Sequence, residues 1–219
     1  MNWVSYLFPQ TLVKTGSVYN RHIRVNLERG KPKLLVNGAR ESGTFIQGLW
    51  EYAFGNLPMP APKTVRSILV IGVAGGTVIH MLRDKYSKAS ITGVDIDQTM
   101  IDIGKHYFGL SSMPRLRLVC ADAQKFVRKR QAKPYDIVVL DIYIGEILPD
   151  FLVSAAFQRA VKSLFHKSGS LFINYEHALG YEAKAQSLEH ILRKLYGDVG
   201  YADIRTNRFF AARVVNAKI

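Results

Sequence analysis

The sequence is short of cysteine, of long apolar runs and of acidic residues. Its 219 residues include a single cysteine, Cys120, so an internal disulfide is excluded and a reducing compartment is favoured. No apolar run approaches the ~18 residues that a membrane-spanning helix needs, and the first residues lack the pattern of a signal peptide. We therefore expect a soluble cytoplasmic protein with no membrane partner and with Cys120 packed in its core.

The shortage of acidic residues leaves a large positive charge. The chain has 30 Lys and Arg residues against 17 Asp and Glu, a formal charge of +13. The densest basic segment is "KFVRKRQAK" at 125–133, and the C-terminal region adds Arg205, Arg208, Arg213 and Lys218. Such segments are typical either of a nucleic-acid footprint or of a solvated helix face. The second interpretation is favoured, because no nucleic-acid-binding motif accompanies the charge.

Short strand-like segments characterise the first 60 residues. They are "HIRVNL", "KLLV" and "ARESG", and Asn37-Gly38 between the last two supplies the positive φ angles of a tight hairpin. Apolar spacing then predicts a helix over 45–54, and a proline-rich linker follows at 58–63. We expect a small antiparallel β module at 1–60 and a nucleoside-binding catalytic domain at 61–219.

Strand and helix patterns alternate from Val65 onward, which indicates an α/β fold with parallel strands and crossover helices. The predicted strands are 67–72, 90–97, 115–121, 135–143 and 170–175, with two closing strands around Thr206-Asn207. The predicted helices are 77–86, 98–108, 123–130, 151–166 and one through Leu188 to Leu195. The pattern predicts a mostly parallel seven-stranded sheet with a C-terminal antiparallel hairpin.

A glycine-rich turn follows the first strand of this sheet, in "LVIGVAGGT". Gly72, Gly75 and Gly76 allow backbone amides at the start of the next helix to approach a ligand without obstruction by Cβ atoms. No Gly-Lys-Ser/Thr follows, so a Walker phosphate loop is excluded, and the spacing differs from the G-x-G-x-x-G of dinucleotide folds. The turn alone leaves its ligand undetermined.

Acidic residues end the next two strands. Asp95 lies 19 residues after Gly76, where a carboxylate can accept both hydroxyls of a ribose. Asp122 ends the third strand, where it could accept from an adenine amino group or cap the following helix. Asp97 is interpreted as a helix cap. Together these positions predict a nucleoside pocket without pyrophosphate contacts, which suits an S-adenosylmethionine-type cofactor better than NAD.

The chemistry is expected at the end of the fourth strand. Asp141 and Tyr143 emerge there from the apolar segment "DIVVL", so the carboxylate should be partly desolvated and able to act as a base. Their alternative roles are a capping aspartate and a core tyrosine. Asn174, Tyr175 and Glu176 end the fifth strand and could line an acceptor site or be ordinary loop residues. The histidines show no metal-ligand spacing, so no metal is expected.

These motifs resemble the polyamine aminopropyltransferases, the family typified by spermidine synthase. The resemblance runs from about Ser17 to Asn174 and rests on "SVYNRHIRV", "LLVNGARESG", Glu51, "GVDID", "CADAQKF", Asp141 and "GSLFIN". The family's usual glycine turn is one residue longer and carries an aspartate, where this chain has Val73-Ala74. The sequence is similar to a subgroup with this shortened turn and an Asp-x-Tyr motif.

The resemblance implies a class I methyltransferase-like Rossmann fold beside the small β module. It implies decarboxylated S-adenosylmethionine as the cofactor, with Asp95 on the ribose side and Asp122 and Ala123 on the adenine side. It also implies transfer of an aminopropyl group to a small-molecule amine, whose proton would be taken by Asp141.

Two alternatives stay open. The first is methyl transfer from S-adenosylmethionine itself in the same pocket, because Ile144 stands at the spacing of a second aspartate that would compensate a diamine. The second is a non-catalytic nucleic-acid-binding protein on the same fold, acting through Arg128, Lys129 and Arg130; this partner is not favoured. A homodimer is also left open.

Overall fold

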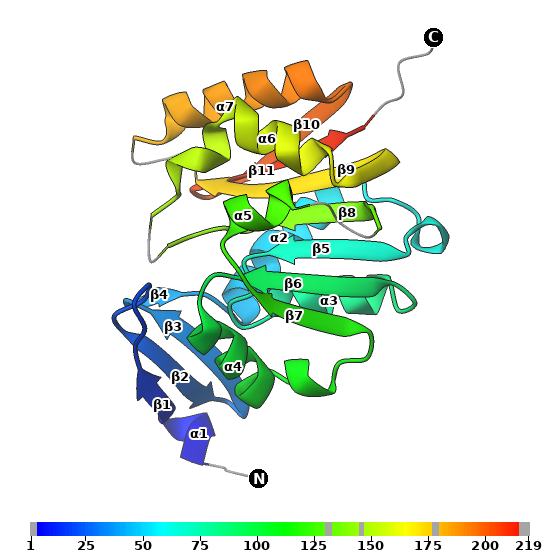
Figure 1. The fold of residues 1–219 in the computed structure, drawn as a ribbon. Helices are drawn as coiled ribbons and strands as arrows, with labels where there is room; N and C mark the ends of the chain where they lie inside the picture. Colours follow the sequence, from blue (N-terminus) through cyan, green and yellow to red (C-terminus); the bar gives the residue numbers. More distant parts are fainter. Residues whose placement is uncertain (1–3, 130–132, 145–146, 177–179, 215–219) are drawn as a thin grey trace.

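The computed structural model describes residues 4–129, 133–144, 147–176 and 180–214 and contains two sheets (Figure 1). The larger sheet has seven strands in the order β10-β11-β9-β8-β5-β6-β7. The strands are β5 (Ser67–Ile71), β6 (Ser90–Asp95), β7 (Leu116–Cys120), β8 (Tyr135–Leu140), β9 (Phe165–Glu176), β10 (Asp198–Ile204) and β11 (Asn207–Arg213). Neighbouring strands from β7 to β9 are parallel, and β11 and β10 are antiparallel. The predicted mostly parallel sheet with a C-terminal hairpin is confirmed.

Helices cover both faces of this sheet because its strands are apolar on both sides. In β5, Leu69 and Ile71 pack toward α5 (Ala123–Arg128), α6 (Ala155–Lys162) and α7 (Glu182–Leu195). The alternate residues Ile68 and Val70 pack toward α2 (Thr44–Asn56) and α3 (Thr77–Lys85). Single-turn 3-10 segments lie at η1 (Pro62–Thr64), η2 (Leu110–Ser112) and η3 (Asp150–Val153). The result is a three-layer Rossmann arrangement of the class I methyltransferase type.

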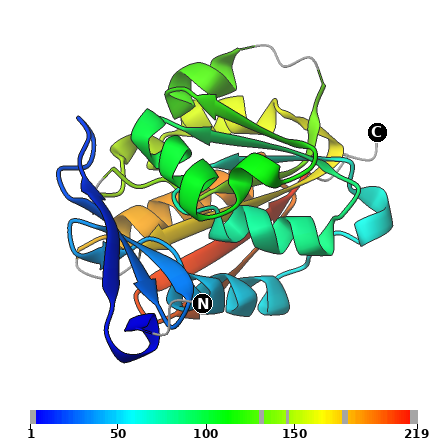
Figure 2. The same ribbon diagram turned by 90° about the horizontal axis from the view of Figure 1, so that it is seen from below.

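The smaller sheet is an antiparallel meander. It follows α1 (Val4–Leu7) and consists of β1 (Gln10–Thr15), β2 (Ile23–Glu28), β3 (Lys31–Val36) and β4 (Ala39–Arg40). Asn37 and Gly38 have φ angles of 50° and 94°, as the predicted hairpin requires. In Figure 1 the arrowheads of β5 and β6 point toward the side where this sheet lies, and Figure 2 shows the same arrangement from below.

Helix α4 (Gln98–Tyr107) joins the two sheets. Its Met100 and Ile103 pack in one apolar cluster with Ile23, Val25, Leu34 and Val36 of the small sheet. At the start of this helix, Asp97 is 2% exposed and accepts hydrogen bonds from the Thr99 backbone amide at 2.9 Å, from the Asn20 side chain at 2.8 Å and from the Ser17 hydroxyl. The prediction that Asp97 caps a helix is confirmed, and the same carboxylate ties the segment before β2 to the large sheet.

Several predicted features differ in the structure. Strand β1 adds to the predicted strands, because apolar and polar residues do not alternate in its sequence QTLVKT. The helix predicted over 151–166 is instead η3 followed by α6, because the Ser154 hydroxyl accepts from the Phe157 amide and starts a new helix there. The closing hairpin turns at Arg205-Thr206, so Asn207 belongs to β11.

One burial prediction is wrong, and another is right only in part. Cys120 is exposed, because it ends β7 at the edge of the sheet, and its thiol donates to the Ile96 carbonyl at 3.5 Å. In α2 the apolar spacing that predicts the helix runs through Phe45, Leu49, Tyr52 and Ala53. The structure buries Leu49, Ala53 and also Trp50, whereas Phe45 and Tyr52 are 37% and 40% exposed. In the described part of the chain, no helix combines the length and apolar character needed to cross a membrane.

We expect Asp97→Ala to lower the free energy of unfolding by about 2–4 kcal/mol, because it removes a helix cap and leaves the Ser17 and Asn20 donors without their acceptor. Thermal and denaturant melts measure this. The matched control is Asp102→Ala on the exposed side of the same helix, which should cost less than about 0.5 kcal/mol. Equal losses in the two variants would contradict this role of Asp97.

Candidate active site

The glycine turn is pressed against the end of a neighbouring strand. The Asp141 backbone amide donates to the Ile71 carbonyl, and the Gly72 amide donates to the Val94 carbonyl, both at 2.8 Å. Gly72 has a φ of 95°, and a Cβ at this position would lie 1.9 Å from the Asp141 carbonyl oxygen. Glycine is therefore required here by both conformation and space. The ends of β5, β6 and β8 converge at this point.

Asp95 holds the rest of the turn. One carboxylate oxygen accepts from the Val73 and Ala74 amides at 2.9 and 3.3 Å, and the other accepts from the Asp97 amide at 2.9 Å. Ala74 has a φ of 43°, in the left-handed region that a side chain disfavours, so these bonds stabilise a strained turn. Burial raises the pKa of Asp95, and the backbone hydrogen bonds act in the opposite direction. Oδ2 uses both of its lone pairs in these bonds, whereas Oδ1 keeps one that can accept a further hydrogen bond.

Asp141 is partly buried and receives two neutral donors. The Trp50 indole nitrogen donates to Oδ2 at 3.1 Å, and the Asn174 amide nitrogen donates to Oδ1 at 2.9 Å. Burial raises the pKa of Asp141, while these two hydrogen bonds favour the ionised form and partly oppose it. A carboxylate with a raised pKa and no cationic partner in either bond has the properties of a general base.

A cavity of about 40 Å³ opens beside these groups. It is lined by Asn20, Val36, Glu41, Gly72, Ala74, Asp95, Met100, Asp141 and Tyr143. Three of these residues are acids, and none of the described lining residues is Lys, Arg or His. The volume holds a reacting group but not a whole nucleoside, which would have to extend along the strand ends outside it.

Tyr143 lies in this cavity as a neutral phenol. Its pKa is raised well above the ordinary tyrosine value, first by burial and then by the negative charges of Asp141, Glu176 and Glu41. The hydroxyl therefore stays protonated at neutral pH and is available as a hydrogen-bond donor.

The structure brings together Gly72, Asp95, Asp141 and Tyr143 in the lining of one cavity. The other predicted site residues lie outside that lining. Gly75 and Gly76 allow close packing, since Cβ atoms there would meet the side chains of Ser42 at 2.6 Å and Leu110 at 2.7 Å. Asp122 caps α5 by accepting from the Lys125 amide at 2.8 Å, and Ala123 is 8% exposed in the first turn of that helix.

Sequence reasoning missed the contributions of Asn20, Glu41, Trp50 and Met100. Trp50 could have been flagged, since a buried indole has one N–H that needs an acceptor. Asn20 and Glu41 come from the small sheet region, about 75 and 54 positions before Asp95 in the chain. No local pattern connects residues so far apart. Asn174, held open as a site or loop residue, lies in β9 and contacts Asp141 directly.

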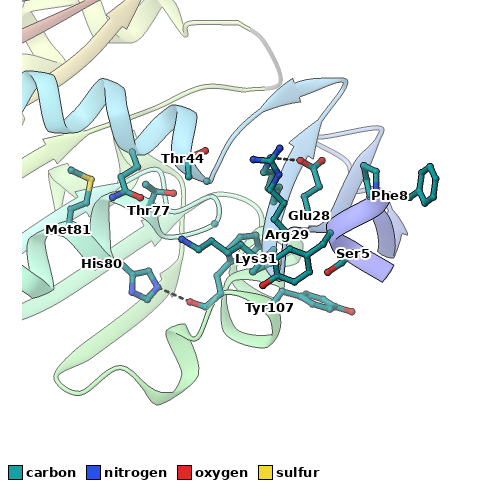
Figure 3. Close-up of a pocket in the computed structure, with 18 of the residues that line it drawn as sticks. Ser5, Phe8, Glu28, Arg29, Lys31, Thr44, Thr77, His80, Met81 and Tyr107 are labelled. Carbon is teal, nitrogen blue, oxygen red and sulfur yellow. Dashed lines mark hydrogen bonds and ion pairs between the residues drawn. The ribbon is translucent and has the colours of Figure 1, made fainter. Parts of the chain in front are cut away.

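A larger groove of about 910 Å³ lies between α3 and the small sheet (Figure 3). Figure 3 shows Thr77, His80 and Met81 of α3 on one side and Arg29 and Lys31 on the other. The His80 ring is within 2.7 Å of the Phe108 carbonyl. Of the predicted site residues, Gly75 lines this groove and the acidic residues do not.

The basic segment is solvated where it is described. Lys125, Arg128 and Lys129 are exposed, and Phe126 and Val127 between them are buried in the core. Arg130 and Lys218 lie outside the described residues.

Comparison with known proteins identifies the family. Residues 51–206 match the model of the spermine/spermidine synthase domain. The chain belongs to the spermine/spermidine synthase family. A polyamine aminopropyltransferase of Vibrio vulnificus is 32% identical over 115 residues, which cover 52% of this chain and 38% of that protein.

Two further similarities bear on the fold and the chemistry. The eEF1A lysine and N-terminal methyltransferase of Bos taurus is 27% identical over 122 residues, which cover 51% of this chain and 18% of that protein. A spermidine synthase in complex with the transition state analogue AdoDATO superposes with a TM-score of 0.71 at 15% identity, over 93% of this chain and 72% of that one. The chain spans less than half the length of these two curated relatives, and both are transferases.

We expect Gly72→Ala to destabilise the protein by about 2–4 kcal/mol, because the new Cβ would overlap the Asp141 carbonyl and the turn would have to move. Chemical denaturation measures the loss. The control is Gly48→Ala on α2, where a Cβ meets no atom within 4 Å and should raise stability by about 0.5–1 kcal/mol. A Gly72→Ala protein as stable as the parent would contradict the packing described for the turn.

Proposed function

We propose that the protein transfers an aminopropyl group from decarboxylated S-adenosylmethionine to a primary amine. The observation that carries the proposal is the charge of the cavity: Glu41, Asp95 and Asp141 line it without a basic residue among the described ones, on a chain of net charge +13. Decarboxylated S-adenosylmethionine brings a sulfonium and an ammonium, and the acceptor brings a second ammonium. Each of these charges is complementary to the acidic lining.

In this proposal the protein distinguishes the two donors by the carboxylate that decarboxylated S-adenosylmethionine lacks. S-adenosylmethionine itself would bring a carboxylate close to Glu41 and Asp141, and like charges in a desolvated cavity repel each other. The acidic lining therefore supports the decarboxylated donor over the carboxylated one.

The nucleoside would lie across the ends of β5, β6 and β7. Asp95 would accept from a ribose hydroxyl with the lone pair left on Oδ1 beside its bond from the Asp97 amide. Asp122 caps α5 through one oxygen, so its second oxygen can accept from the adenine amino group, with Ala123 beside the ring. Gly72 keeps the turn free of a side chain where the donor approaches.

Asp141 would act as the general base. The acceptor arrives as an ammonium and gives one proton to the Asp141 carboxylate, which frees the nitrogen lone pair. That lone pair attacks the aminopropyl carbon bonded to sulfur, the C–N bond forms and the C–S bond breaks with its electron pair left on sulfur. The products are methylthioadenosine and a secondary ammonium. Because the sulfonium is already a good leaving group, the protein's task is alignment and proton removal.

Methyl transfer from S-adenosylmethionine is the second candidate function. The similarity to the Bos taurus methyltransferase favours it. The residue Ile144 also favours it, because an apolar side chain stands where the resemblance to spermidine synthase expects a second aspartate for a diamine.

We expect Asp141→Asn to lower kcat by about 10²–10⁴-fold, since the amide cannot take the amine proton. The assay measures methylthioadenosine released from decarboxylated S-adenosylmethionine with a panel of primary amines and diamines. The matched control is Asp102→Asn, which replaces an exposed acid on α4 by the corresponding amide and should leave kcat unchanged.

The same assay has a pH signature. Because burial raises the pKa of Asp141, kcat/KM should fall as the pH drops through a value above the ordinary aspartate range, and this limb should vanish in Asp141→Asn. No methylthioadenosine from the parent protein with any amine of the panel would overturn the proposed function.

Donor choice separates the two candidate functions. We expect calorimetry to show binding of decarboxylated S-adenosylmethionine at least about 10-fold tighter than binding of S-adenosylmethionine, because the cavity offers the extra carboxylate no basic partner among the described residues. Glu41→Gln should narrow this ratio by relieving the repulsion. The reverse order of affinities would favour methyl transfer.

A further inference from the structure

A chain of side-chain hydrogen bonds leads away from Asp141 to the C-terminal hairpin. The Asn174 amide nitrogen donates to Asp141 at 2.9 Å, and the Asn207 amide nitrogen donates to the Asn174 carbonyl oxygen, also at 2.9 Å. Asn207 is the first residue of β11 and pairs with Glu176 of β9, so it is the diagonal neighbour of Asn174 across the two strands.

The bonds to Asp141 and from Asn207 together set which way the Asn174 amide faces. An asparagine amide has a donor side and an acceptor side of nearly the same shape, and the two can exchange by rotation. The Asn207 donor occupies the Asn174 oxygen, so the Asn174 nitrogen is left to face Asp141. In the rotated form two donors would face each other at Asn207, and an oxygen would face the Asp141 carboxylate.

We propose that Asn207 is a positioning residue for the active site: it holds the Asn174 amide in the orientation that donates to Asp141 and so keeps that carboxylate fixed beside the cavity. The positioning role in catalysis rests on the proposed function, whereas the effect on Asp141 itself does not.

The same hairpin supports the other donor to Asp141. Phe209 of β11 packs edge-on against the Trp50 ring, with centroids 4.8 Å apart, and Trp50 is fully buried. Arg205 in the turn lies 5.1 Å over the ring of Phe45 near the start of α2. The hairpin therefore contacts both elements whose side chains donate to Asp141, which explains how a residue outside the cavity can act on it.

We call the hydrogen-bond chain from Asn207 through Asn174 to Asp141 the relay. The other charged and titratable groups around Asp141 do not replace it. Glu41, Asp95 and Tyr143 share the cavity, and Glu176 acts on Tyr143 from β9. All are acidic or neutral, so within the described lining the ionised carboxylate depends on the neutral donors Asn174 and Trp50.

The test compares Asn207→Asp with Thr206→Asp. In Asn207→Asp the new carboxylate cannot donate, so the Asn174 amide should turn its nitrogen toward it and present its oxygen to Asp141, which must then hold a proton. Thr206→Asp places the same charge one residue away in the exposed turn without touching the relay. The midpoint of the acid limb of kcat/KM should move up by about one pH unit in Asn207→Asp. It should move by only a few tenths in Thr206→Asp.

A second readout needs no turnover. The carboxyl carbon of Asp141, observed by NMR in aspartate-labelled protein and assigned by its loss in Asp141→Asn, should titrate with the same upward displacement in Asn207→Asp. If the protein makes no methylthioadenosine but Asn207→Asp still shows this displacement, the proposed reaction is wrong and the role of Asn207 in positioning Asn174 is supported. Equal midpoints in Asn207→Asp and Thr206→Asp would overturn the relay.

Two further variants keep the test decisive if Asn207→Asp melts at working temperature. Asn207→Gln keeps an amide donor and should titrate within a few tenths of a pH unit of the parent. Asn207→Leu removes the donor without adding charge and should raise the Asp141 midpoint in the NMR titration. A midpoint unchanged in Asn207→Leu would also overturn the proposal.

Discussion

The partly buried carboxylate of Asp141 is the constraint around which this fold is arranged. A desolvated carboxylate is stable only when its oxygens are hydrogen-bonded. Here the donors come from α2 on one face of the sheet and from β9 within it, through Trp50 and Asn174. Helix α2 must therefore lie across the sheet beside β11, and Phe209 fills the space between them. The positions of α2, β9 and β11 are thus tied to the Asp141 side chain.

This strongly basic protein has an acidic cavity. The net charge and the charge of the cavity act over different distances. The exposed lysines and arginines are screened within about 8–10 Å at physiological salt. The cavity is lined by Glu41, Asp95 and Asp141, so its local field is set by acids at contact distance. Net charge therefore says little about the ligand of a small buried site, and the inference from +13 to an anionic partner does not extend to this cavity.

Sequence reasoning reached those site residues whose place follows from topology alone. Gly72, Asp95 and Asp141 end parallel strands, and the ends of parallel strands meet at one edge of a sheet. The contributions of Trp50, Glu41 and Asn207 depend on how α2, the small sheet and the hairpin dock, which no local pattern records. The sequence pattern places Asn207 in the closing turn and Cys120 in the core. The second prediction is wrong because the pattern of a single strand does not show which strand becomes the edge of the sheet.

The shortened glycine turn and the small sheet are best understood together. The resemblance to spermidine synthase implies an aspartate in this turn, whereas here Val73 and Ala74 use their amides to bind Asp95 and leave the turn without an acid. The cavity is acidic nonetheless, because Glu41 reaches it from the small sheet, which Asp97 ties to α4. Under the proposed reaction, the positive charge of the substrate is therefore compensated by Glu41 beside the small sheet and not by an acid in the turn. The preference for one acceptor amine over another should then depend on the contacts of Asp97 and α4 that hold the small sheet in place.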